Sequence, residues 1–226
     1  MEYENIRQAK FISRPNRFLS YIEIDGRVER CHVKNTGRCK EILVPGTTVY
    51  VRESGNSNRK TKYDLISAYK GDRLINIDSQ VPNRVFYEWV TGGNLFDDIT
   101  LIKPECKYKN SRFDFYIETP SRKAFIEVKG VTLEIDGVAM FPDAPTERGV
   151  RHLTELCQSV REGYEAYVVF IIQMKSVLYF APNIKTHKAF RDALKMAADK
   201  GVKVLAFDCE VTETSILAGN FVGVKI

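Results

Sequence analysis

The chain is 226 residues long, with 44% hydrophobic and 28% charged residues, which allows one large domain or two small ones with an ordinary apolar core. No apolar run approaches the roughly 18 residues needed to cross a bilayer, and the first residues are acidic and polar, unlike a signal peptide. We therefore expect a cytoplasmic protein without a membrane partner. The net charge of +5 lies entirely in residues 1–80, which hold 15 Lys and Arg against 10 Asp and Glu; residues 81–226 hold 19 of each kind. This asymmetry favours contact between the N-terminal part and a polyanion, although mild basicity is also common in proteins that bind none.

The first part of the chain reads as short strands. The runs 18–25 and 28–33 flank an Asp-Gly turn, which is a strong hairpin signal, and further runs follow at 48–52, 63–69 and 74–77. Five short strands in about 60 residues suit a small Greek-key barrel, and the OB-fold is the commonest barrel of this kind that binds nucleic acid. We assign residues 1–80 to an OB-fold nucleic-acid-binding domain.

Beyond Pro82 the pattern changes from strands alone to strands and helices. Apolar residues at helical spacing run to Gly92-Gly93, and a helix is expected there. We then expect strands at 99–108, 112–118 and 124–129, a loop rich in Gly and Pro, a helix to about residue 162, strands at 167–173 and 177–180, a helix at 186–200, and a strand at 202–207. Residues 81–226 are thus predicted to be a mixed α/β domain, and the fold class is α/β (α+β overall).

The cysteines and histidines do not favour a zinc cluster or a disulfide scaffold. The five cysteines include no CxxC pair, and the three histidines are far apart in the chain. We interpret most of the cysteines as small buried hydrophobic residues.

Two predicted strands, 112–118 and 124–129, form a hairpin that concentrates the chemically active side chains. If Glu118 pairs with Lys123 across a four-residue loop, Asp114 lies directly opposite Glu127, with Cβ atoms roughly 4.5–5.5 Å apart. Lys129 lies on the same face, two residues further along. The opposite face is entirely apolar and is predicted to be the core side, which supports this register because a slip of one residue would break the match. That face carries Phe113, Phe115, Ile117, Ile126 and Val128.

Opposed carboxylates repel each other unless a cation lies between them. A hard ion such as Mg²⁺ (or Mn²⁺) fits Asp114 and Glu127, because it prefers oxygen ligands and keeps waters for chemistry. Lys129 would then steady or help deprotonate the attacking water, or hold the scissile phosphate, so that the set suits phosphodiester hydrolysis. The alternative is a solvated polar face on an amphipathic hairpin. An acidic-x-Lys triplet alone is weak evidence, since Glu105-Cys106-Lys107 is a second example.

The helix after the hairpin carries a polar stripe. Arg148, His152 and Glu155 are spaced by four and three residues, opposite the apolar side, so they could face the same cleft as the carboxylates. The alternative is a solvated helix face with an ordinary Glu–His contact. We assign Arg112, Arg148 and His152 to nucleic-acid binding and Glu155 to a supporting role.

A loop in the barrel half is a second candidate site. Asn35, Thr36, Gly37 and Arg38 together offer backbone N–H groups and a guanidinium, which suit a phosphate. The alternative is a turn with a surface arginine. We assign Asn35, Thr36 and Arg38 to nucleic-acid binding, and we expect at most two of the nearby aromatic residues to stack on bases.

Four runs of sequence carry a resemblance to a known family. They are His32–Arg38, Ser111–Phe115, Glu127–Leu133 and Phe141–Gly149, in the same order along essentially the whole chain. Together they resemble the bacterial and archaeal sugar fermentation stimulation protein family. The resemblance implies an N-terminal OB-fold, a C-terminal domain similar to the PD-(D/E)xK restriction-endonuclease superfamily, DNA binding, and a link to regulation of sugar (maltose) metabolism.

The same resemblance implies roles for the hairpin residues. Asp114 takes the place of the motif aspartate, and Glu127 and Lys129 form the acidic-x-Lys element. Phe113 stands where the superfamily usually has proline, which leaves metal chemistry open without establishing it.

Two functions are therefore in competition. The first is a Mg²⁺-dependent nuclease-like phosphodiesterase with an OB-fold that grips the substrate. The second is a non-catalytic DNA-binding regulator with a vestigial nuclease site. A purely structural module gains nothing from the charge asymmetry or from opposed carboxylates. DNA is the expected partner, with single-stranded nucleic acid or RNA as alternatives, and the oligomeric state stays open.

Overall fold

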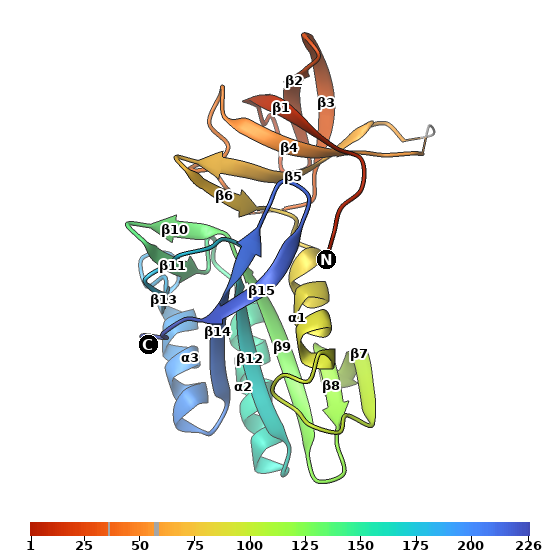
Figure 1. The fold of residues 1–226 in the computed structure, drawn as a ribbon. Helices are drawn as coiled ribbons and strands as arrows, with labels where there is room; N and C mark the ends of the chain where they lie inside the picture. Colours follow the sequence, from red (N-terminus) through yellow and green to blue (C-terminus); the bar gives the residue numbers. More distant parts are fainter. Residues whose placement is uncertain (36, 57–58) are drawn as a thin grey trace.

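The computed structural model describes residues 1–35, 37–56 and 59–226, and it places a β-barrel at one end of a mixed α/β domain (Figure 1). Within these ranges the strands of the barrel sheet follow the order β3-β2-β1-β4-β5-β6, and β3 also pairs with β5 in parallel, which closes the first five strands into a barrel. The predicted OB-fold is therefore confirmed. The strands are β1 (Ile6–Ser13), β2 (Leu19–Ile24), β3 (Arg27–Val33), β4 (Thr48–Glu53), β5 (Tyr63–Lys70) and β6 (Arg73–Asn76).

One barrel strand differs from the prediction. Strand β1 was not expected, because its only fully buried side chains are Ala9 and Phe11 and the rest of the segment is largely polar. The predicted strand at 74–77 is instead β6, which forms a hairpin with β5 at the edge of the sheet. The predicted turn between β2 and β3 is present: Asp25 and Gly26 both have positive φ, as a two-residue hairpin turn of this hand requires.

The second domain is a mixed α/β domain, as predicted. Its main sheet follows the order β15-β14-β12-β9-β8-β7 in the described residues, with β9, β12 and β14 parallel to one another. The Gly- and Pro-rich loop contains an unexpected hairpin, β10–β11, and the unexpected β15 extends the main sheet. The elements are α1 (Val81–Thr91), β7 (Leu101–Tyr108), β8 (Ser111–Glu118), β9 (Lys123–Val131), β10 (Leu133–Ile135), β11 (Val138–Phe141), α2 (Glu147–Arg161), β12 (Glu165–Ile172), β13 (Tyr179–Pro182), α3 (Lys188–Asp199), β14 (Lys203–Val211) and β15 (Ile216–Phe221).

None of the helices in the described part of the chain is both long enough and apolar enough to cross a membrane. Helix α1 packs on one face of the main sheet, and α2, which also contacts α3, packs on the other (Figure 1). Both faces of the main sheet are therefore covered.

The predicted hairpin register is confirmed where β8 and β9 pair. Phe115 lies opposite Ile126, and Glu118 lies opposite Lys123. The predicted division of faces is only partly correct. Phe115, Ile117, Ile126 and Val128 do share the core under α1, but Phe113 lies in the other core, 5.4 Å from the Phe125 ring.

Alternate residues of a regular strand share a face, so the alternation is broken between Phe113 and Phe115, where the pairing of β8 with β9 ends. The predicted pairing of Asp114 with Glu127 therefore lies outside the paired part of the hairpin. Asp114 accepts a hydrogen bond from Asn83 of α1 and Glu127 contacts His152 of α2, and these helices cover opposite faces, so the prediction that both carboxylates point to one face is not confirmed.

A buried glutamine joins the two domains. Gln173, 1% exposed, follows β12, and its Nε2 donates to the carbonyl oxygens of Asn76 (3.0 Å) and Asp78 (3.0 Å) at the end of the barrel. The backbone N–H of Asn76 donates in return to the Gln173 carbonyl, at 2.9 Å. Gly130 of β9 allows this approach, since a Cβ at that position would lie 2.6 Å from Gln173 Oε1. The barrel is therefore fastened beside the end of β9.

Gln173→Ala should lower the free energy of unfolding by about 2 kcal/mol, because it leaves the buried carbonyl of Asn76 without the donor that Gln173 supplies. Chemical denaturation measures this loss. Gln8→Ala, an exposed substitution on β1, is the matched control and should be nearly neutral. Equal stability of the two variants would contradict the role given to Gln173.

Candidate metal and nucleic-acid site

Asp114 is held from two sides at the point where β8 and β9 stop pairing. Its Oδ1 accepts a hydrogen bond from Asn83 Nδ2 in the first turn of α1 (2.8 Å), and its Oδ2 accepts one from the backbone N–H of Val128 (2.8 Å). Burial and the neighbouring charge of Glu127 raise the pKa of Asp114 above its usual value. The carboxylate is therefore fixed in orientation and costly to ionise.

Glu127 lies beside Asp114 and is only 3% exposed. Its Oε1 contacts both Lys129 Nζ and His152 Nδ1, whereas its Oε2 is buried and has no hydrogen-bond partner in the described part of the chain. Burial alone would raise the pKa of Glu127, but Lys129 and His152 outweigh it and lower that pKa. Glu127 is thus ionised, and its Oε2 has no hydrogen-bond partner among the described residues.

His152 is oriented by a second residue of its own helix. Arg148 Nε donates to His152 Nε2 at 3.3 Å, so the imidazole proton is assigned to Nδ1, which faces Glu127. His152 itself is 3% exposed. The predicted cluster of Asp114, Glu127, Lys129 and His152 is therefore brought together.

This arrangement fits a hard divalent ion. In the described residues no group of three or more His, Cys, Asp or Glu side chains could hold a metal, so a cage made of such side chains alone is absent. Mg²⁺ is commonly bound by one or two carboxylates and completed by water or substrate phosphates. The free Oε2 of Glu127 offers one ligand, and each Asp114 oxygen keeps a lone pair beside the hydrogen bond it accepts.

The predicted stripe on α2 lies in a different environment from the one expected. His152 and Glu155 are on the buried side of the helix, so the stripe does not form a solvated face. Arg148, His152 and Arg112 line one cleft of about 490 Å³, whereas Glu155 is buried away from that lining and its Oε2 has no partner among the described residues. Arg112 is largely exposed and lies 3.5 Å from Glu105.

In the barrel loop, two of the backbone N–H groups that were expected to hold phosphate are already engaged. The Gly37 N–H donates to Asn35 Oδ1 (2.7 Å), and the Arg38 N–H donates to Asp143 Oδ2 (3.0 Å), from the loop before α2. Asp143 thus occupies the place expected for a phosphate and links the barrel to the α/β domain. The guanidinium of Arg38 is exposed, and Thr36 lies outside the described residues.

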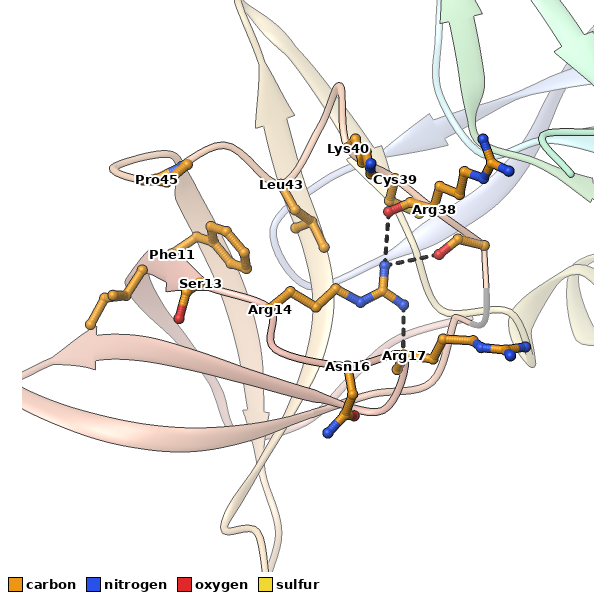
Figure 2. Close-up of a pocket in the computed structure, with 12 residues that line it drawn as sticks. Phe11, Ser13, Arg14, Asn16, Arg17, Arg38, Cys39, Lys40, Leu43 and Pro45 are labelled. Carbon is orange, nitrogen blue, oxygen red and sulfur yellow. Dashed lines mark hydrogen bonds between the residues drawn. The ribbon is translucent and has the colours of Figure 1, made fainter.

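Arg14 also has a structural role in this loop. Figure 2 shows its guanidinium reaching the backbone of the loop, where it donates to the carbonyl oxygens of Gly37 (2.8 Å) and Arg38 (3.0 Å). It also donates to the carbonyl oxygen of Arg17 (2.8 Å), between β1 and β2. These bonds support one wall of a hollow of about 410 Å³ in the barrel.

Asn83 was not predicted from the sequence. It follows Pro82 in the first turn of α1, and an asparagine in that position carries no signal that separates it from an ordinary surface residue. Only the packing of α1 across β9 brings its amide to Asp114.

Comparison with known proteins shows matches along the chain. Residues 12–77 match the model of the SfsA N-terminal OB domain, and residues 80–215 match that of the sugar fermentation stimulation protein RE domain. The sugar fermentation stimulation protein homolog of Desulfitobacterium hafniense is 65% identical over 226 residues, covering 100% of this chain and 99% of the relative. That of Clostridium beijerinckii is 61% identical over 224 residues, covering 99% of each. The solved structure of Pyrococcus furiosus SfsA in complex with Ca²⁺ is 31% identical, has a TM-score of 0.90, and is matched over 100% of this chain and 98% of that chain.

The pKa of Asp114 is raised and that of Glu127 is lowered, so replacing each carboxylate by an amide should change the stability of the protein in opposite directions. The measurements are made in EDTA, without a divalent metal ion. The raised pKa of Asp114 means that its stabilising contribution is present at low pH and lost as pH rises through the folded-state pKa, so Asp114→Asn should raise Tm at pH 7. The lowered pKa of Glu127 means that its contribution is present at neutral pH and lost as pH falls. Glu127→Gln should therefore cost about 3 kcal/mol at pH 7, because it breaks a buried ion pair.

Thermal unfolding between acid and neutral pH measures both effects, with the exposed Asp97→Asn as the control. The gain from Asp114→Asn should shrink as the pH falls. Shifts of the same sign in the two variants would contradict this assignment of charges.

Proposed function

The chain belongs to the sugar fermentation stimulation protein family, and we propose that it is a cytoplasmic DNA-binding protein whose α/β domain hydrolyses phosphodiester bonds with Mg²⁺ or Mn²⁺. The observation that carries the proposal is the proximity of Asp114, whose pKa the charge of Glu127 raises, to a buried Glu127 whose Oε2 has no partner among the described residues and whose Oε1 contacts Lys129. The resemblance also implies a link to the regulation of sugar (maltose) metabolism, which would act through the proposed binding of DNA.

The energetic cost of the site supports a functional ion. A half-buried Asp114 with a raised pKa and an unsatisfied oxygen on Glu127 both lower the stability of the free protein. A divalent cation would offset both costs, because it neutralises the carboxylates and supplies the missing partner. Strongly perturbed carboxylates of this kind cluster at functional sites.

The choice of ion has support from a related protein. Pyrococcus furiosus SfsA was solved in complex with Ca²⁺, a hard cation that prefers oxygen ligands as Mg²⁺ does. We propose that the present chain binds an ion of the same class through Asp114 and Glu127.

The chain's own residues have separable tasks in this proposal. When bound, the ion would supply charge neutralisation and an activated water. Asn83 and the Val128 N–H orient Asp114, and His152 holds Glu127 in place. Lys129 places an ammonium group beside the carboxylates, where it would contact the phosphate of the bond to be cleaved. The exposed Arg38, together with Arg112 and Arg148, would contact the backbone of the strand.

One observation favours the non-catalytic alternative. Glu127 Oε1 already contacts Lys129 and His152, so the cluster offsets part of its own charge without an ion. In that case the chain would be a DNA-binding regulator with a vestigial nuclease site.

Cleavage assays on purified protein distinguish the two functions. With Mg²⁺ or Mn²⁺ the wild type should cleave DNA, single-stranded DNA or RNA, and EDTA should abolish the activity. Asp114→Asn, Glu127→Gln and Lys129→Ala should each lower the rate by about 100-fold or more, the effect expected when a group that stabilises developing charge is lost. The first two should bind DNA at least as well as the wild type, since each removes negative charge near the phosphates.

All variants must be purified identically, with Asp97→Asn as a control that keeps full activity. Cleavage that survives all three substitutions would assign the activity to another site or to a contaminant. A wild type that binds DNA but cleaves none of these substrates with either metal would favour the regulator.

A further inference from the structure

The turn between β7 and β8 faces the N-terminal half of α2 across the cleft of about 490 Å³ that adjoins His152. Cationic side chains dominate its lining in the described residues. They are Lys107, Lys109, Arg112, Arg148 and Arg151. This basic cleft lies in the half of the chain that has no net charge, so its cations are concentrated by the fold rather than by composition.

Most of this positive charge is not compensated within the protein. Lys107, Arg148 and Arg151 form no ion pair with an acidic residue of the described part of the chain, whereas Lys109 and Arg112 pair with glutamates at the rim. Unpaired cations around one hollow repel each other. The arrangement therefore favours an anionic ligand.

The position of Arg148 on α2 adds to the electrostatic cost of gathering these cations. Arg148 is the second residue of the helix and therefore lies at the positive end of its dipole, where cations are unfavourable, whereas Arg151, the fifth, begins the next turn. Glu147, in the same turn as Arg148, is largely exposed and contacts His187 (3.2 Å). An anion bound in the cleft would interact favourably both with the cations and with this end of the helix dipole.

Ser111 provides an independent indication of a ligand. It lines the basic cleft and is 5% exposed, yet its hydroxyl is buried and has no hydrogen-bond partner among the described residues. A buried hydroxyl without a partner costs free energy. A ligand oxygen that accepts from Ser111 Oγ would satisfy it.

The basic cleft adjoins the carboxylate site through one residue, His152. His152 lines the cleft and contacts Glu127 through Nδ1, while Arg148 contacts the other ring nitrogen. A group bound in the cleft is therefore a near neighbour of a phosphate bound at Asp114 and Glu127.

We propose that the basic cleft binds a phosphate group of the nucleic-acid strand, next to the phosphodiester at the carboxylate site. The inference rests on the proposed function. Lys107 and Arg151 supply charge to this phosphate, and Ser111 donates a hydrogen bond to it. The phosphate is either an internal phosphodiester or a terminal monophosphate, which have the same anionic oxygens.

The charge contribution is tested with the double variant Lys107→Gln, Arg151→Gln. Its matched control is Lys195→Gln, Arg161→Gln, which removes the same charge from an exposed position of α3 and from the far end of α2. Fluorescence anisotropy in EDTA measures the Kd of a labelled DNA strand across a range of salt. The cleft variant should bind about tenfold more weakly, and its slope of log Kd against log[salt] should fall by about 0.7–0.9 for each phosphate that the protein no longer neutralises. The control should keep the wild-type slope.

Ser111→Ala separates ligand binding from structure. It should raise the Tm of the free protein, because a buried unpaired hydroxyl is removed, and weaken DNA binding severalfold without changing the salt slope. Ser67→Ala is the control: Ser67 lies in β5, and its buried hydroxyl likewise has no hydrogen-bond partner among the described residues, so its Tm should rise with no change in affinity.

The two sources of phosphate are distinguished with strands that carry a 5′-hydroxyl or a 5′-phosphate. A loss of affinity in the cleft variant that is confined to the phosphorylated strand indicates a terminal phosphate, and an equal loss for both strands indicates an internal one. Wild-type affinity and slope in the cleft variant would overturn the inference, even if Asp114→Asn abolishes cleavage and thereby supports the proposed function. A cleft variant that binds more weakly, in a protein that never cleaves, supports the subsite and refutes catalysis. A wild type that binds neither strand overturns both.

Discussion

The proximity of two carboxylates is the constraint on which the site depends. Asp114 and Glu127 repel each other in a buried environment that screens charge poorly, and the surrounding residues offset part of that repulsion. Lys129 and His152 contact one oxygen of Glu127, and Asn83 fixes Asp114 from α1. These groups come from both faces of the sheet, so the site exists only when the helices are packed on either side.

The position of the barrel follows from the same region. Gln173 joins the end of β12 to the end of the barrel, and Gly130 of β9, one residue after Lys129, leaves room for it. Asp143 reaches from the loop before α2 to the Arg38 N–H. The barrel is thus held against the end of the α/β domain where β9 and α2 approach the site. We infer that a bound nucleic-acid strand would contact both domains.

Hydrophobic alternation predicted the hairpin register correctly from Phe115 and Ile126 to the turn, because a slip by one residue would have moved both side chains out of the core under α1. The same reasoning misplaced Phe113 and the stripe of His152 and Glu155, because it assumed that polar residues mark a solvated face. On a sheet covered on both sides, a polar residue can be buried if it has a partner, as His152 does in Glu127. Segment charge was also a poor guide, since acidic residues elsewhere in 81–226 cancel the cations that gather at the basic cleft. Asn83 could be found only from three-dimensional packing.

The central claim is that Asp114 and Glu127 bind a divalent cation together. Anomalous diffraction from crystals soaked in Mn²⁺ tests it most directly, because the ion is located without reference to activity. The account predicts a peak within about 2.0–2.3 Å of an oxygen of each carboxylate, and no such peak in crystals of Asp114→Asn. A peak that persists in that variant, or wild-type crystals that bind Mn²⁺ only elsewhere, would contradict it.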